Sequence, residues 1–91
     1  MSMPVARTGS AKNITGTGNV SVGDCQLHGF YVNSTSSGTL VLRRGGSGGT
    51  AISGTITPAI GWHRFPAAVA GPLHATIANT LDATFFFASG N

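Results

Sequence analysis

The chain has 91 residues and a mass of 9.2 kDa, which suit a single domain and exclude a second folded one. Charged residues make up only 8% of it, where about 25% is usual, and a net charge of +3 with a mean hydropathy of +0.20 excludes a disordered chain. Because Asp24 and Asp82 are the only acidic residues, paired-carboxylate catalysis would require these two to meet.

The basic residues are few and scattered, since Arg7, Lys12, Arg43, Arg44 and Arg64 lie in three separate regions. Contact with a phosphate backbone needs a denser basic stripe, so we expect no binding to nucleic acid. Gly, Ser, Thr and Asn take the place of the missing charges, and a surface with so little repulsion permits dense association. The composition therefore favours a component of a larger assembly.

Residues 1–18 mix small polar residues with two cations and predict a flexible N-terminal arm, which leaves residues 19–91 for the folded domain. The arm has no apolar run of signal-peptide length, and no window reaches the roughly 20 apolar residues of a membrane helix. We therefore expect a protein made in the cytoplasm and not inserted in a membrane.

From residue 19 onward, turn signals recur about every 8 to 12 residues between runs of β-branched and aromatic residues, which predicts an all-β fold. The Ala-rich stretch at residues 66–70 lies between prolines and has no helical period, so no helix is expected. We expect a compact antiparallel β-sandwich, Ig-like or jelly-roll-like, with six or seven strands at residues 19–23, 26–33, 38–44, 50–57, 62–65, 73–79 and 82–89.

Side-chain alternation assigns faces to these strands. It places His28 on the same face as Phe30, and it makes Leu40 and Leu42 the expected core pair. The glycine-rich residues 45–49 should form a projecting loop.

The last predicted strand has phenylalanine on both faces. Phe85 and Phe87 share one face, while Asp82, Thr84 and Phe86 share the other. A surface strand of a monomer should have one polar face, so this strand is either covered or places Phe86 against a partner subunit.

Four residues could in principle bind a metal: Cys25, His28, His63 and His74. Structural zinc sites usually have two close ligand pairs, whereas His63 and His74 are eleven positions apart, so we expect structural histidines and no cofactor. The lone Cys25 cannot form an internal disulfide and should be buried. Alternation along the strand places Cys25 and His28 on opposite faces, so His28 cannot act as its catalytic base, and no enzymatic activity is expected.

Tyr31 and Trp62 allow two interpretations. A small domain needs its large side chains for burial, which favours a place in the core; alternatively, with Arg64 nearby, they could stack on sugars or bases.

Several segments resemble a recurring type of small bacteriophage virion protein. They are SGTLVL at residues 37–42, GTAISGTITP at 49–58, GWHRFP at 61–66, GPL at 71–73 and TLDATFFF at 80–87. The resemblance implies a capsid decoration (cement) protein, made in the host cytoplasm and located on the capsid surface of the virion, with the major capsid protein as its partner.

Two hypotheses follow from this resemblance. In the first, a trimer clamps capsid subunits through Arg7 and Lys12 of the arm and through a sheet face with Trp62, Arg64 and Phe86. The alternative is a module at the virion tip that binds a host receptor or glycan through Trp62 and Tyr31. Hundreds of copies per particle would support the first hypothesis, and a few copies at one vertex the second.

Overall fold

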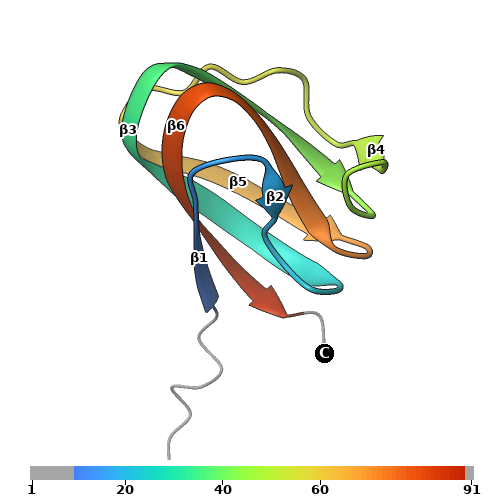
Figure 1. Ribbon diagram of the computed structural model, residues 1–91. Helices are drawn as coiled ribbons and strands as arrows, with labels where there is room; N and C mark the ends of the chain where they lie inside the picture. The colour runs from blue at the N-terminus through green and yellow to red at the C-terminus, as the bar shows by residue number, and fades with distance from the viewer. Residues whose placement is uncertain (1–9, 90–91) are drawn as a thin grey trace, which may run out of the picture.

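The computed structural model describes residues 10–89, which form one antiparallel sheet of six strands with no helix among them (Figure 1). The strands are β1 (Ser10–Ile14), β2 (Gly18–Asn19), β3 (Cys25–Arg44), β4 (Thr50–Ala51), β5 (Gly61–Val69) and β6 (Leu73–Ser89).

The long strands β3 and β6 pair with each other from end to end and form the centre of the sheet. β1 and β2 line the other side of β6, and β4 and β5 line the other side of β3. Each long strand therefore has a short neighbour along each of its two halves.

Both long strands bend sharply near their middle, so that the sheet folds over on itself (Figure 1). β3 has 20 residues where β6 has 17, and three register shifts in their pairing absorb the difference. Ser37 and Asn79 adopt positive φ values of 56° and 61° at the bend, and the Asn79 side-chain amide donates a 2.8 Å hydrogen bond to the Ser37 carbonyl. Gly38 is required beside them, because a Cβ there would collide with the Thr80 carbonyl and with Leu81.

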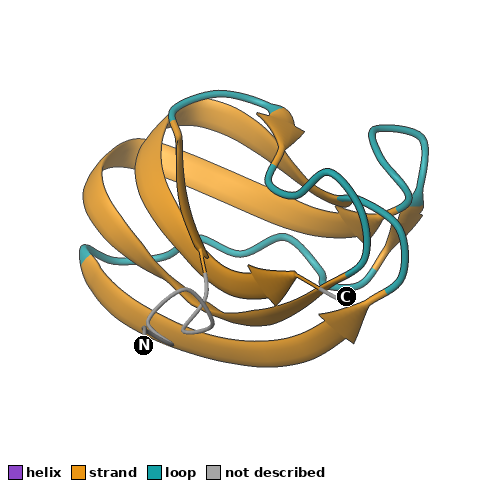
Figure 2. Ribbon diagram, turned by 90° about the horizontal axis from the view of Figure 1, so that it is seen from below, coloured by secondary structure: helices purple, strands orange, loops and turns teal. Residues whose placement is uncertain are grey.

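The bend divides the sheet into two layers. Layer 1 comprises β1, residues 25–34 of β3, β5 and residues 81–89 of β6; layer 2 comprises β2, residues 38–44 of β3, β4 and residues 73–79 of β6. Figure 2 shows the two halves of the folded sheet opposite each other. The predicted all-β antiparallel fold is confirmed, with its two layers built from one continuous sheet.

One core lies between the layers and contains residues of both. Leu40 and Leu42 are fully buried as predicted, and the Phe30 ring lies 5.3 Å from Phe85 and 5.2 Å from His63, centroid to centroid. The buried apolar residues are Ile14, Val20, Cys25, Leu27, Phe30, Val32, Leu40, Leu42, Val69, Leu73, Ala75, Leu81, Ala83, Phe85 and Phe87.

The prediction that residues 26–33 and 38–44, and likewise 73–79 and 82–89, are separate strands is wrong. Each pair is one strand that bends instead of turning back, because the register shifts and the two positive φ values change the direction of the chain while the pairing continues.

The prediction that His28 and Phe30 lie on the same face is also wrong. The register shifts between Leu27 and Gly29, so Leu27 and Phe30 are both buried while His28 between them is exposed. Such a β-bulge breaks simple alternation, and Gly29 is the one local sign of it, since glycine within a strand often marks a bulge.

Four predicted segments differ at their boundaries, and the first is residues 62–65, which belong to the longer strand β5 (Gly61–Val69). The arm is described only from Ser10, and Ser10–Ile14 is strand β1, paired with β6. Of residues 19–23 only Asn19 is strand, since the Ser21 hydroxyl closes a turn by donating to the Gly23 carbonyl. Residues 50–57 retain only β4 and one bridge at Ile56, because the Ser53 hydroxyl accepts the Leu42 N–H in place of a backbone carbonyl.

Candidate functional site

The outer face of layer 1 is the surface on which aromatic and polar side chains meet. Phe85 and Phe87 point into the core, so Phe86 between them and Thr84 before them point outward, and their cross-strand partners share that face. Two rows of facing residues cross β1, β6, β3 and β5 in that order. The first row is Asn13, Thr84, Tyr31 and Trp62, and the second is Ala11, Phe86, Gly29 and Arg64.

Three exposed aromatic side chains on adjacent strands form what we call the aromatic cluster: Tyr31, Trp62 and Phe86, with exposed fractions of 44%, 50% and 37%. The rings of Trp62 and Phe86 meet edge to face, with centroids 5.6 Å apart and planes at 65°. Trp62 reaches across Gly29 to do so, since a Cβ on Gly29 would lie 2.9 Å from two carbons of the indole. The absence of a side chain at position 29 therefore sets the place of the indole.

The expectation that Tyr31 and Trp62 fill the core is wrong. The space between the layers is occupied by Phe30, Phe85 and the leucines, and both Tyr31 and Trp62 stand at outward positions of paired strands. The prediction that Phe86 lies on the face opposite Phe85 and Phe87 is confirmed, and this face is exposed at Phe86 in the described chain.

A polar cluster of Asn13, Asn33, Asp82 and Thr84 adjoins the aromatic cluster at Tyr31. The Asn13 amide donates to Asp82 Oδ1 at 2.7 Å and to Thr84 Oγ1 at 3.1 Å, and the Asn33 amide donates to the same two atoms at 3.2 Å each. One carboxylate oxygen and one hydroxyl thus hold two amide side chains from different strands in fixed positions.

The role of Asn13 and Asn33 in this cluster was not predicted from the sequence. Asn13 was assigned to a flexible arm, and only the pairing of β1 with β6 brings it to Thr84. The alternation that placed Asp82 and Thr84 on the face of Phe86 was the one available signal, and that placement is confirmed.

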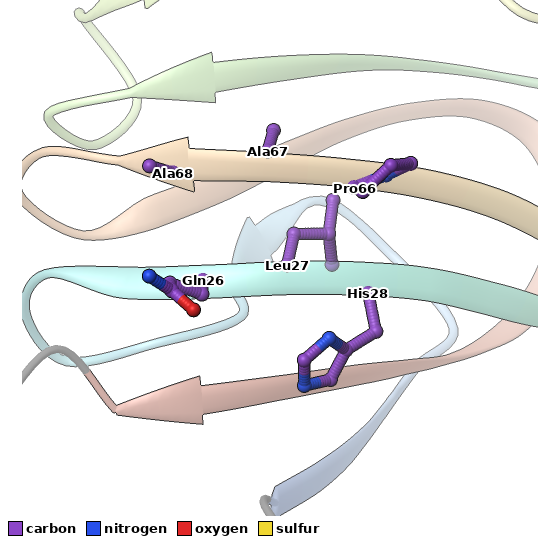
Figure 3. Close-up of a pocket in the computed structure, with 6 residues that line it drawn as sticks. All are labelled: Gln26, Leu27, His28, Pro66, Ala67 and Ala68. Carbon is purple, nitrogen blue, oxygen red and sulfur yellow. The ribbon is translucent and has the colours of Figure 1, made fainter.

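Next to the second row, the same face is hollowed (Figure 3). The shallow hollow has a volume of about 310 Å³ and lies between the start of β3 and the end of β5. Figure 3 shows its lining side chains, which are Gln26, Leu27, His28, Pro66, Ala67 and Ala68.

The five residues expected at one interface do not lie together. Trp62, Arg64 and Phe86 share the outer face of layer 1. Lys12 lies on β1, at the opposite edge of the layer from β5, and faces Phe85 across the pairing, so its side chain starts on the other side of the sheet. Arg7 lies outside the described residues.

The residues considered as metal ligands are also dispersed. Cys25 is a buried free thiol, His28 is exposed beside the hollow, and the His63 Nε2–H donates to the Ala59 carbonyl at 2.7 Å. Within residues 10–89, no group of three or more His, Cys, Asp or Glu side chains is placed to bind a metal ion.

His74 lies in layer 2, where its Nδ1–H donates to Asn19 Oδ1 at 2.9 Å, while its buried Nε2 has no hydrogen-bond partner in the described part of the chain. Burial, and then the charge of Arg43, lower the pKa of His74 below its ordinary value. A neutral imidazole is therefore favoured at this position.

The two edges of layer 1 differ. β5 contains Pro66, which has no N–H, and a register irregularity, both of which hinder pairing with another strand. β1 has neither feature; four of its five side chains are exposed, and within the described residues only β6 pairs with it.

Comparison of the chain with protein-family models, curated protein sequences and solved structures found no match. Among residues 10–89 there is no helix of the length and apolarity needed to cross a membrane.

Proposed function

We propose that this protein is a non-enzymatic decoration protein of a bacteriophage head, which attaches to the major capsid protein on the capsid surface. The observation that supports this function best is the open edge at β1 (Ser10–Ile14). An edge strand without proline or bulge presents backbone N–H and C=O groups to which a strand of another protein can add.

The charge on this edge favours one kind of partner. Lys12 lies in the middle of β1, where it would oppose pairing with β1 of a second copy, because two lysines would then be close. A capsid segment with Asp or Glu beside its strand would instead pair with Lys12. Arg7, five positions before Lys12 in the sequence, is a second cation near β1 in sequence and lies outside the described residues.

Binding to stripped particles tests this attachment. Purified protein is added back to capsids from which it has been removed, and bound copies are counted. Lys12→Glu should lower the affinity about fivefold, because an exposed ion pair is worth at most about 1 kcal/mol. The matched control is Arg44→Glu, an equal charge change at an exposed position in layer 2, which should have no effect. Equal binding by both variants would contradict attachment at β1.

The copy number per particle distinguishes decoration from a role at one vertex. A decoration protein should be present in hundreds of copies per purified particle, whereas a tip module should be present in a few. We further propose a trimer at the threefold positions of the capsid, which sedimentation of the free protein or of the protein released from particles can check.

A further inference from the structure

The outward positions of the two layers are built on the same two strands but have different side chains. In layer 2 the outward residues of β3 and β6 are Thr39, Val41, Arg43, Thr76 and Ala78, while His74 at the remaining position is buried. In layer 1 the corresponding positions, with those of β5, include Tyr31, Trp62 and Phe86. Layer 2 forms without outward aromatic side chains, so pairing and folding of this sheet do not by themselves require them.

The exposed aromatic area suits a small ligand rather than a protein. Aromatic side chains bury about 150–250 Å² each when covered, so the exposed fractions of 44%, 50% and 37% correspond to roughly 200–330 Å² in total. A standard protein interface covers about 800 Å² on each partner. The ligand should therefore cover the aromatic cluster and gain its remaining contacts from the polar groups beside it.

We propose that the outer face of layer 1 is a carbohydrate-binding site. A sugar ring has one face of C–H groups and a rim of hydroxyl groups. The electron-rich faces of Trp62 and Tyr31 attract polarised C–H groups, while hydroxyls need hydrogen-bond acceptors and donors at the rim of the rings. The first row places these two requirements side by side, since Trp62 is opposite Tyr31, Tyr31 is opposite Thr84, and Thr84 is opposite Asn13.

The polar cluster has acceptors available for hydroxyl groups. Asp82 uses Oδ1 for the two amides, and no hydrogen bond among residues 10–89 uses its second oxygen or the side-chain carbonyls of Asn13 and Asn33. Because the two amides are already held by Asp82 and Thr84, their side chains lose little further conformational entropy when a ligand binds.

Nucleic acid is the other class of ligand that stacks on aromatic rings, and the charges on this face exclude it. A nucleic acid strand would bring phosphates, yet the first row ends next to Asp82, and Arg64 is the one cation in the two rows. Carbohydrate is the class that combines stacking with hydroxyl groups and needs no cationic groove.

The site has room for more than one sugar unit. From the second row the face continues past Gly29 into the hollow of about 310 Å³, where the Gln26 amide and the His28 imidazole are available as further polar partners. An oligosaccharide can therefore extend along β3 from the polar cluster toward Gln26.

This site includes the outward side chain of Asn13 on β1, whereas the proposed capsid contact uses the backbone edge of β1 and Lys12, whose side chain starts on the other side of the sheet. A decoration protein held by that edge can bind sugar through its outer face while attached to the particle. The two proposals can therefore fail independently.

The sole tryptophan of the chain is Trp62, so its fluorescence reports on the site directly. The free protein is titrated with a panel of oligosaccharides of glucose, galactose, mannose and N-acetylglucosamine. We expect a saturable change in emission with at least one of them. Tyr31→Ala should weaken that binding about two- to tenfold by loss of stacking, and Asp82→Ala about tenfold by loss of a charged acceptor.

Two variants control for indirect effects. Val22→Ala removes an apolar side chain that is 98% exposed in the loop before β3, and Thr76→Ala alters the outer face of layer 2; both should bind as the original protein does. The inference is overturned if no sugar of the panel changes the emission, or if Tyr31→Ala and Asp82→Ala bind as tightly as the controls.

A measurement on the particle-bound protein distinguishes whether sugar or capsid covers the outer face of layer 1. Acrylamide should quench Trp62 as well in the particle-bound protein as in the free protein. If attachment to the capsid protects Trp62, the face is a capsid contact, and the carbohydrate proposal is wrong while decoration stands. If Lys12→Glu leaves attachment to the capsid unchanged but sugars bind, attachment at β1 is wrong while the carbohydrate proposal stands.

Discussion

The outer faces of layers 1 and 2 differ although β3 and β6 form the centre of both. In layer 2, Val41 faces Thr76 and Arg43 faces the buried His74, whose imidazole donates to Asn19 on the neighbouring strand. On the outer face of layer 1, by contrast, aromatic rings lie next to the hydrogen-bonded carboxylate of Asp82. Since both layers bury the same kind of apolar core, the core does not account for the difference between their outer faces.

The comparison also separates two uses of aromatic residues in one strand. Phe85 is fully buried and packs on Phe30, whereas its neighbour Phe86 is exposed and meets Trp62. Burial of Phe85 stabilises the fold by removing apolar area from water, while over a third of the surface of Phe86 stays exposed to solvent.

The largest expected effect is at Gly29, the position in layer 1 over which the indole lies. Gly29→Ala places a methyl group against the His63 carbonyl and the Trp62 ring, so we expect the free energy of unfolding in urea to fall by about 1–3 kcal/mol. Gly54→Ala is the control, since nothing lies within 4 Å of a Cβ there. Equal stability of the two variants would mean that the position of Trp62 is not fixed by Gly29.

A smaller effect should separate the cross-strand contacts of the two faces. A double-mutant cycle with Trp62→Ala and Phe86→Ala should give a coupling of about 0.5–1.5 kcal/mol, as expected for an edge-to-face pair. The matched cycle in layer 2 uses Val41→Ala and Thr76→Ala, which are directly opposite each other, and should give a value near the lower end of about 0.2–1 kcal/mol. A larger coupling in layer 2 would remove the distinction between the faces.

The smallest effect concerns pH and layer 2. Folding lowers the pKa of His74 from its ordinary value of 6.5. At pH values between the lowered pKa and 6.5, the unfolded chain therefore binds more protons than the folded one. The free energy of unfolding should therefore decrease as the pH falls below 6.5 and be constant above it, as measured by urea denaturation. His74→Asn keeps a donor for Asn19 and should remove this slope; a slope that persists in the variant would exclude His74 as its source.

Composition and turn spacing were sufficient to predict the all-β antiparallel fold, the core pair Leu40 and Leu42, and the place of Phe86 on the face opposite Phe85 and Phe87. These depend on local residue type and on alternation within an uninterrupted stretch of strand. The two long strands could not be predicted, because Ser34–Ser37 and Thr80 look like turn residues and only the three register shifts show that pairing continues through them.

The candidate site was predictable only in part, for the same reason. Trp62, Tyr31 and Arg64 were recognised as possible ligand contacts from their types, but their exposure depends on the pairing of β5 with β3. The polar cluster joins β1, β3 and β6, which are separated by up to 71 positions in the sequence, and no local pattern brings such residues together.

The most direct test of the proposed binding role of the layer 1 face is an NMR titration of the ¹⁵N-labelled protein with the oligosaccharide panel. The proposed site predicts that shift changes appear at Gly29, at Tyr31, at the Trp62 indole N–H and at the side-chain amides of Asn13 and Asn33, while Arg43, His74 and Thr76 of layer 2 stay unchanged. Changes centred on layer 2, or a spectrum that no sugar alters, would contradict it.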